Sequence, residues 1–124
     1  MNRKFLIVDD SNTMRRIVVN TLKSLGYNEY VEAEDGKVAL EKLTADNSIN
    51  FVITDWNMPV MTGLELTKAI RSNESTKDLP ILMVTTRGVK DDIVQALQAR
   101  VSNYVVKPFT PQILKEKIDL VLSN

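Results

Sequence analysis

The 124-residue sequence contains neither cysteine nor histidine. The absence of cysteine excludes disulfides, a thiolate nucleophile and a cysteine-based zinc site. The absence of histidine excludes a Ser-His-Asp triad and a phosphohistidine carrier, so any histidine chemistry must come from a partner. The metal-binding side chains that remain offer oxygen ligands.

An excess of charge and a long apolar run are also missing. Sixteen basic and sixteen acidic residues cancel, which argues against partners such as nucleic acid or an anionic membrane. No apolar run at the N-terminus is long enough for a signal peptide or a membrane span. We therefore expect a cytoplasmic monomer that forms one domain over residues 1–124, with no effector domain after it.

Short apolar runs alternate with segments of helical spacing. The predicted strands cover residues 5–8, 30–33, 51–54, 81–84 and 104–106. The predicted helices begin after Ser11 or Asn12, after an Asp35-Gly36 turn, at residue 64, around residues 93–97 and at Pro111. Strands joined by helical crossovers indicate an α/β fold, with a parallel sheet covered on both faces.

Polar side chains follow four of the five predicted strands. Asp9 and Asp10 follow the first, Asp55 the third, Thr85 the fourth and Lys107 the fifth. Ligands of such sheets bind outside the carboxyl ends of the strands, so these residues are expected at one site. Each also has a structural interpretation: a helix cap for Asp10, a turn for Asp55 or Thr85, and a solvated charge for Lys107.

The expected cluster of carboxylates has a specific chemistry. Two carboxylates about 4 Å apart repel by roughly 4 kcal/mol at an effective dielectric constant near 20. A cation would relieve this repulsion, and oxygen ligands alone favour a hard ion such as Mg²⁺. A phosphoryl group on Asp55 would then have its oxygens held by the metal, Lys107 and the Thr85 hydroxyl, with Asp55 as the nucleophile.

With these residues the sequence resembles a response-regulator receiver domain, in particular the single-domain chemotaxis regulators of that family. The resemblance spans the chain and rests on Asp9-Asp10, the DWNMP run of residues 55–59, Thr85, Tyr104 and the KPF run of residues 107–109. It implies the flavodoxin-like fold with five helices and strand order 2-1-3-4-5.

The resemblance also implies roles for the site residues. Asp55 would be the phosphoacceptor, and Lys107 would contact the phosphoryl group. Asp10, Asp55 and the backbone carbonyl of Asn57 would bind Mg²⁺, with Asp9 assisting through water. The protein would accept phosphoryl from a histidine kinase and would not be a turnover enzyme for an external substrate.

Thr85 and Tyr104 would form the switch pair, and the Lys107-Pro108 bond would be cis. Output would pass through a surface around Tyr104, Val106 and Lys117. The partner reading that surface would be a flagellar motor switch protein, and a phosphatase is a further expected partner.

Arg100, Thr86 and Arg87 are less typical of the family. Arg100 stands where a glycine is usual; a left-handed backbone there would cost roughly 1–2 kcal/mol. Arg87, after Thr86, would affect phosphoryl lifetime and phosphatase recognition.

Trp56 is expected on the opposite side of its strand from Asp55, partly exposed over the rim of the pocket.

Other functions remain open at this stage. The protein could be a phosphate sink or relay intermediate without a motor target. A flavodoxin-like cofactor binder is a different class, but the acidic edge is unsuited to an FMN phosphate. A Mg²⁺-dependent phosphohydrolase would need an acid/base beside Asp55, and the sequence offers none.

Overall fold

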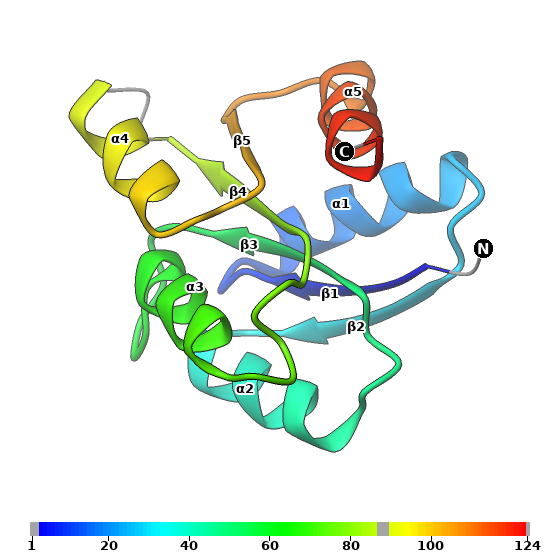
Figure 1. The fold of residues 1–124 in the computed structure, drawn as a ribbon. Coiled ribbons are helices and arrows are strands. Elements are labelled where there is room, and N and C mark those ends of the chain that lie inside the picture. Colours follow the sequence, from blue (N-terminus) through cyan, green and yellow to red (C-terminus); the bar gives the residue numbers. More distant parts are fainter. Residues whose placement is uncertain (1–2, 87–89, 124) are drawn as a thin grey trace.

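The computed structural model describes residues 3–86 and 90–123, with the backbone alone for residues 90–93. In these residues strands and helices alternate (Figure 1): β1 Lys4–Val8, α1 Asn12–Ser24, β2 Glu29–Ala33, α2 Gly36–Ala45, β3 Phe51–Asp55, α3 Gly63–Ser72, β4 Ile81–Thr85, α4 Lys90–Gln98, β5 Asn103–Val106 and α5 Pro111–Leu122. All strand pairs are parallel, in the order β2-β1-β3-β4-β5. The expected α/β fold and its strand order are confirmed. None of the described helices is long and apolar enough to cross a membrane.

The sheet separates two hydrophobic clusters, because successive side chains of a strand point to opposite faces. Leu6 and Val52 pack with α2, α3 and α4 on one face. Phe5 and Phe51 pack with α1 and α5 on the other (Figure 1). Burial of each such large side chain stabilises the fold by roughly 1.5–3 kcal/mol. The central strands are apolar on both faces, which explains their continuous hydrophobic runs.

Helix ends follow local signals in the sequence. Ser11 caps α1 by accepting a hydrogen bond from the backbone N–H of Met14, and Gly26 follows the helix with a φ of 92°. Thr110 caps α5, which begins at Pro111 as expected. These side chains satisfy backbone donors that the first turn of a helix leaves without partners.

Two helices begin earlier than the sequence pattern predicts. Asp35 caps α2 and Gly36 is its first residue, so the expected turn is a helix start. Thr62 caps α3 through a capping box with Glu65, and Gly63 is the first helical residue. The capping hydrogen bonds outweigh the low helix propensity of glycine at these ends.

Among the residues that the structure describes, two other than glycine have positive φ angles. Arg100 has a φ angle of 69°, so its backbone is left-handed at a position where the family usually has glycine. Val60, at 70°, lies in the β3–α3 loop, where Met61 N donates to the carbonyl of Pro59 at 2.7 Å. This hydrogen bond closes a strained three-residue turn around a β-branched residue. The Lys107-Pro108 bond is cis, as expected.

Candidate functional site

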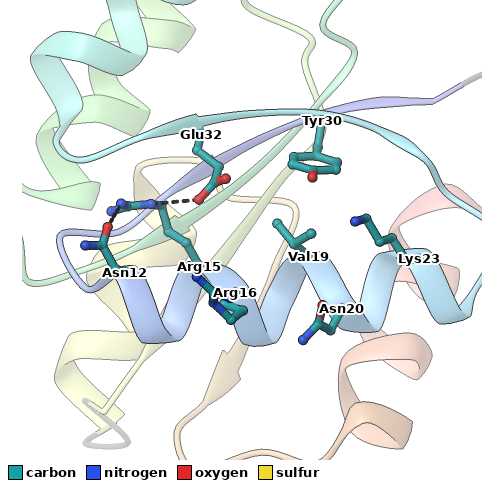
Figure 2. A pocket seen from close by; sticks show the side chains of 8 residues that line it. All are labelled: Asn12, Arg15, Arg16, Val19, Asn20, Lys23, Tyr30 and Glu32. Atoms are coloured by element: carbon teal, nitrogen blue, oxygen red, sulfur yellow. Dashed lines mark hydrogen bonds and ion pairs between the residues drawn. The ribbon is translucent and has the colours of Figure 1, made fainter.

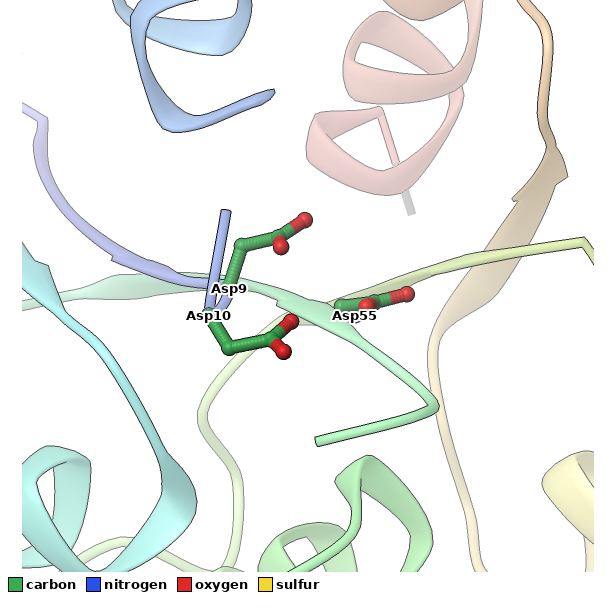
Figure 3. A group of neighbouring side chains, drawn as sticks. All are labelled: Asp9, Asp10 and Asp55. Carbon is green, nitrogen blue, oxygen red and sulfur yellow. The ribbon is translucent and has the colours of Figure 1, made fainter. Parts of the chain in front are cut away.

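Three carboxylates meet at the carboxyl edge of the sheet. Asp9 follows β1 and its backbone N donates to the carbonyl of Ala33 at 3.1 Å, while Asp55 ends β3. One carboxylate oxygen from each of Asp9, Asp10 and Asp55 lies within 4.8 Å of the others (Figure 3). Asp9 and Asp55 are 4% and 7% exposed, and Asp10 is exposed to solvent. The parallel register therefore brings together the acids that the sequence places after separate strands.

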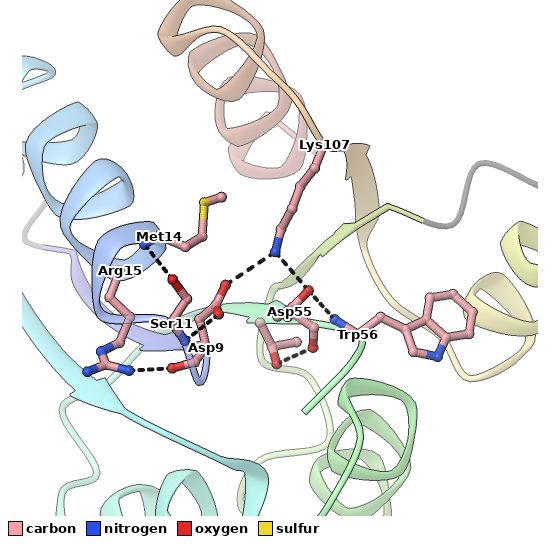
Figure 4. A network of polar contacts seen from close by, with 8 residues as sticks. Asp9, Ser11, Met14, Arg15, Asp55, Trp56 and Lys107 are labelled. Carbon is pink, nitrogen blue, oxygen red and sulfur yellow. Dashed lines mark hydrogen bonds and ion pairs between the residues drawn. The ribbon is translucent and has the colours of Figure 1, made fainter. Parts of the chain in front are cut away.

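Lys107, the residue after β5, completes this cluster. Its Nζ lies 3.1 Å from Oδ1 of Asp55 and 3.4 Å from Oδ2 of Asp9 (Figure 4). The backbone N of Lys107 donates to the carbonyl of Thr85 at 2.7 Å, which ties the residue to the end of β4. The Lys107 side chain is 16% exposed. A largely buried ammonium thus faces two buried carboxylates.

Neighbouring residues of the chain contact both the carboxylate and the backbone carbonyl of Asp55. The backbone N of Trp56 donates to Oδ1 at 2.9 Å, and the Thr54 hydroxyl donates to the Asp55 carbonyl at 3.0 Å. Gly63 packs so closely that an added Cβ would lie 2.1 Å from the same carbonyl oxygen. Only glycine fits at this start of α3, which makes Gly63 part of the support of the site.

Burial raises the pKa of Asp55, and the negative charge of Asp9 raises it further. The Lys107 ammonium and the Trp56 N–H act in the opposite direction and only partly offset these effects. Three carboxylates against one ammonium leave an excess of negative charge in a poorly solvated place. This donor set of oxygens fits a hard divalent cation. Asn57 is exposed in the bend that follows β3.

The residues expected to form the switch and the output surface lie on β4, β5 and α5. Thr85 ends β4 with 1% exposure. Tyr104, on β5, is half-buried and packs against the cluster under α2, α3 and α4. The Nζ of Lys117, on α5, lies 5.2 Å from the centre of the Tyr104 ring. Val106 is 38% exposed at the end of β5. Tyr104, Val106 and Lys117 are thus partly accessible residues of β5 and α5.

The expectation for Trp56 is half wrong. The side chain leaves the chain on the opposite side from the Asp55 carboxylate, as the alternation predicts (Figure 4). It is only 4% exposed, however, and belongs to the core cluster with Met58 and Leu66. The indole is therefore part of the core on the α2, α3 and α4 side of the sheet and is not partly exposed at the pocket rim.

Some single side chains also differ from what the sequence pattern alone indicates. Ile17 has the helical spacing of the buried residues in α1 but is 42% exposed, whereas Val19 is buried. The expectation for Arg87 lies outside the described residues. Sequence reasoning did not single out Arg15, whose guanidinium donates to the carbonyl of Asp9. A basic residue in the first turn of an amphipathic helix carries no signal that distinguishes it from a solvated charge.

Comparison with known proteins shows the family of this chain. The model of the response regulator receiver domain matches residues 5–119.

The chain belongs to the response regulator receiver domain family.

Receiver domains similar to this one are named chemotaxis proteins. Chemotaxis protein CheY1 of Helicobacter pylori is 56% identical over 121 residues, which cover 98% of each chain. Chemotaxis protein CheY of Pseudomonas aeruginosa is 53% identical over 121 residues, covering 98% of this chain and 97% of its own. This family and these relatives identify the chain as a CheY-type receiver domain, a signalling protein of two-component systems.

Solved structures of receiver domains agree with the fold. CheY4 of Vibrio cholerae is 38% identical, with a TM-score of 0.89 over 98% of this chain and 99% of that one. The receiver domain of a sensor histidine kinase from Pseudomonas aeruginosa is 25% identical, with a TM-score of 0.87 over the full length of both chains. That structure is described as having a magnesium ion coordinated in the active site cleft.

Proposed function

We propose that this receiver domain accepts a phosphoryl group on Asp55 from the phosphohistidine of a histidine kinase. The observation that supports this role most directly is the contact between Lys107 and Asp55. The Lys107 ammonium and the Trp56 N–H both bind Oδ1 of Asp55. Within the described residues this leaves Oδ2 without a hydrogen bond, so Oδ2 is the oxygen available for attack.

In this reaction Oδ2 of Asp55 forms a bond to phosphorus while the bond from phosphorus to the kinase imidazole breaks. The imidazole keeps the electron pair and takes up a proton. Transfer of this kind depends mainly on positioning and on neutralising the charge of the phosphoryl oxygens. Lys107 supplies a positive charge at 3.1 Å from the carboxylate, and the Thr85 hydroxyl at the end of β4 is proposed to bind a phosphoryl oxygen.

Mg²⁺ is the proposed cofactor. Asp10, Asp55 and the backbone carbonyl of Asn57 would hold it, with Asp9 assisting through water. When bound, the ion supplies positive charge that offsets the repulsion among the carboxylates and the phosphoryl group. The oxygen-only donor set supports this proposal, as does the magnesium described in the related receiver domain from Pseudomonas aeruginosa.

The output is proposed to be a population shift. Attraction of the Thr85 hydroxyl to the phosphoryl group would free space that the Tyr104 ring can enter. The surface of α4, β5 and α5 around Tyr104, Val106 and Lys117 would then bind its target. The chemotaxis names of the relatives support a cytoplasmic protein with a flagellar motor switch protein as target and a phosphatase as a further partner. In this role the chain turns over no external substrate.

The test is to map the adduct. The protein is incubated with a small acyl phosphate and Mg²⁺, reduced to trap the acyl phosphate, and analysed by peptide mass spectrometry. We expect one adduct, on Asp55, which Asp55→Asn loses and Asp119→Asn, an exposed control on α5, retains. An adduct kept at full yield in Asp55→Asn would refute the proposal. An adduct on Asp55 without any change in target binding would instead indicate a phosphate sink or relay.

A further inference from the structure

Arg15 links α1 to β2 and to the segment that joins β1 to α1, behind the acidic cluster. Its Nε lies 2.9 Å from Oε1 of Glu32 on β2, Nη1 donates to the carbonyl of Asp9, and Nη2 donates to Oδ1 of Asn12 (Figures 2 and 4). The Arg15 side chain is only 13% exposed, although the residue lies in the first turn of a surface helix. Three acceptors on a rigid planar fork leave the guanidinium group one orientation.

The contact with the Asp9 carbonyl is part of a complete set around that residue. The backbone N of Asp9 donates to the carbonyl of Ala33 at 3.1 Å. Its Oδ1 accepts from the backbone N of Ser11 at 2.9 Å, and its Oδ2 lies 3.4 Å from Nζ of Lys107. Every polar group of Asp9 therefore has a partner, and the guanidinium group supplies the one at the carbonyl.

The carbonyl of Asp9 belongs to the same peptide unit as the backbone N of Asp10. A peptide unit is planar, so a hydrogen bond that fixes its oxygen also fixes the plane from which the next residue departs. Asp10 is the exposed member of the cluster, and no hydrogen bond within the described residues holds its carboxylate. The direction of this carboxylate therefore depends on the peptide that Arg15 orients.

We infer that Arg15 is a positioning residue for the cation site, acting through the Asp9 carbonyl to aim the Asp10 carboxylate. The inference rests on the proposed function, because the cation concerned is the Mg²⁺ proposed above. Partners of metal ligands commonly have this effect, and their loss lowers metal affinity about 10- to 100-fold.

Charge and positioning make opposite predictions for this residue. Arg15 is a cation close to the acidic cluster, so its charge alone opposes the binding of a second cation. Neutralising it would tighten Mg²⁺ binding if charge were all that mattered. Loss of the oriented peptide would weaken binding. The sign of the change thus separates the two roles.

The experiment measures Mg²⁺ binding to the full chain by titration calorimetry, with Mg²⁺ alone and no phosphodonor. For Arg15→Met we expect the dissociation constant to rise about tenfold. Arg15→Lys keeps the charge, but one ammonium cannot replace the three-way fork, so we expect a rise of similar size. The matched control is Arg16→Met. Arg16 is exposed on the wall of a groove of about 460 Å³ between α1 and β2 (Figure 2), and its loss should leave the constant unchanged or slightly lower.

A second measurement needs no metal. The amide resonance of Asp10, recorded with a chelator present, should shift in Arg15→Met and stay in place in Arg16→Met. A merely structural loss of stability would not move this resonance in a protein that remains folded. Dissociation constants are compared at a temperature where unfolding curves show each variant to be folded.

The outcomes are distinct. If the wild type binds Mg²⁺ and Arg15→Met binds it equally well or more tightly, the inference is wrong and the proposed function stands. If Arg15→Met does not fold, Arg15→Lys decides, because a wild-type constant in that variant would overturn the positioning role. If the wild type binds no Mg²⁺, the proposed function fails and the inference fails with it.

Discussion

The ammonium of Lys107 lies 3.1 Å from Oδ1 of Asp55, although the two residues come from the ends of different strands. The same ammonium is 3.4 Å from Asp9, so one cation serves two buried carboxylates. This arrangement neutralises part of the cluster and leaves the rest of its negative charge for an added cation.

Lys107→Ala should show how the Lys107 ammonium contributes to stability, to Mg²⁺ binding and to the response to phosphorylation. With a chelator present, loss of the ammonium leaves two buried carboxylates without their partner, and we expect the free energy of unfolding to fall by about 1–3 kcal/mol. Mg²⁺ binding should be unchanged or a few-fold tighter, because a competing cation is gone. The phosphorylation-dependent change in target binding should weaken. Urea unfolding, calorimetry and a binding assay measure these quantities.

The control for this variant is Lys115→Ala, which removes an exposed lysine of α5. It should match the wild type in all three measurements. If Lys107→Ala responds to phosphorylation as the wild type does, the role assigned to Lys107 is wrong.

The raised pKa of Asp55 predicts a pH-dependent stability in the absence of Mg²⁺. Between the ordinary carboxyl pKa of 3.8 and the raised value, the folded protein holds a proton that the unfolded chain has released. The wild type therefore loses stability as the pH rises through this window. Asp55→Asn has no such group, so it should be the more stable protein at neutral pH.

Urea unfolding at a series of pH values, with a chelator present, tests this prediction. The advantage of Asp55→Asn should shrink as the pH falls toward 3.8 and should not occur in Asp119→Asn. A difference between Asp55→Asn and the wild type that is constant over this range would contradict the assigned cause.

Trp56 should report the site from within the core. Its backbone N binds Asp55 and its carbonyl accepts from the backbone N of Gly63 at 2.8 Å, so changes at the carboxylate reach the indole through its own peptide units. We expect weak quenching by acrylamide, because the side chain is 4% exposed, and a saturable change in emission on adding Mg²⁺. Phosphodonor should give a second change only when Mg²⁺ is present.

Variants assign these two fluorescence signals. Asp10→Asn should weaken the response to Mg²⁺, and Asp55→Asn should abolish the response to phosphodonor. Asp119→Asn should behave as the wild type. A flat Mg²⁺ titration together with no heat of binding would rule out the metal site.

Arg71 should stabilise the end of the sheet opposite the site. Its guanidinium donates to the carbonyl of Arg100 at 2.9 Å and to those of Lys77 and Leu79 at 2.9 and 2.6 Å. Arg71→Met would leave these carbonyls without their charged donor, and we expect the free energy of unfolding to fall by about 2–4 kcal/mol. Lys68→Met, an exposed change on the same helix, is the control. Equal urea midpoints for the two variants would contradict this role.

Much of the fold and the cluster could be predicted from the sequence. Continuous apolar runs belong to strands buried on both faces, and residues that follow parallel strands must meet at one edge. Asp9, Asp55 and Lys107 were therefore predictable as neighbours. The caps Ser11 and Thr110 were also predictable, because a capping hydrogen bond is made within a few residues of sequence.

The tertiary structure alone decided which side chains are covered and which distant groups meet. Alternation places Trp56 on one side of β3, but burial depends on the path of the loop and on the packing of α3. The reach of Arg15 to Glu32 and to the Asp9 carbonyl depends on how α1 lies against β2. Such contacts join residues whose separation along the chain has no period, and for that reason no sequence pattern records them.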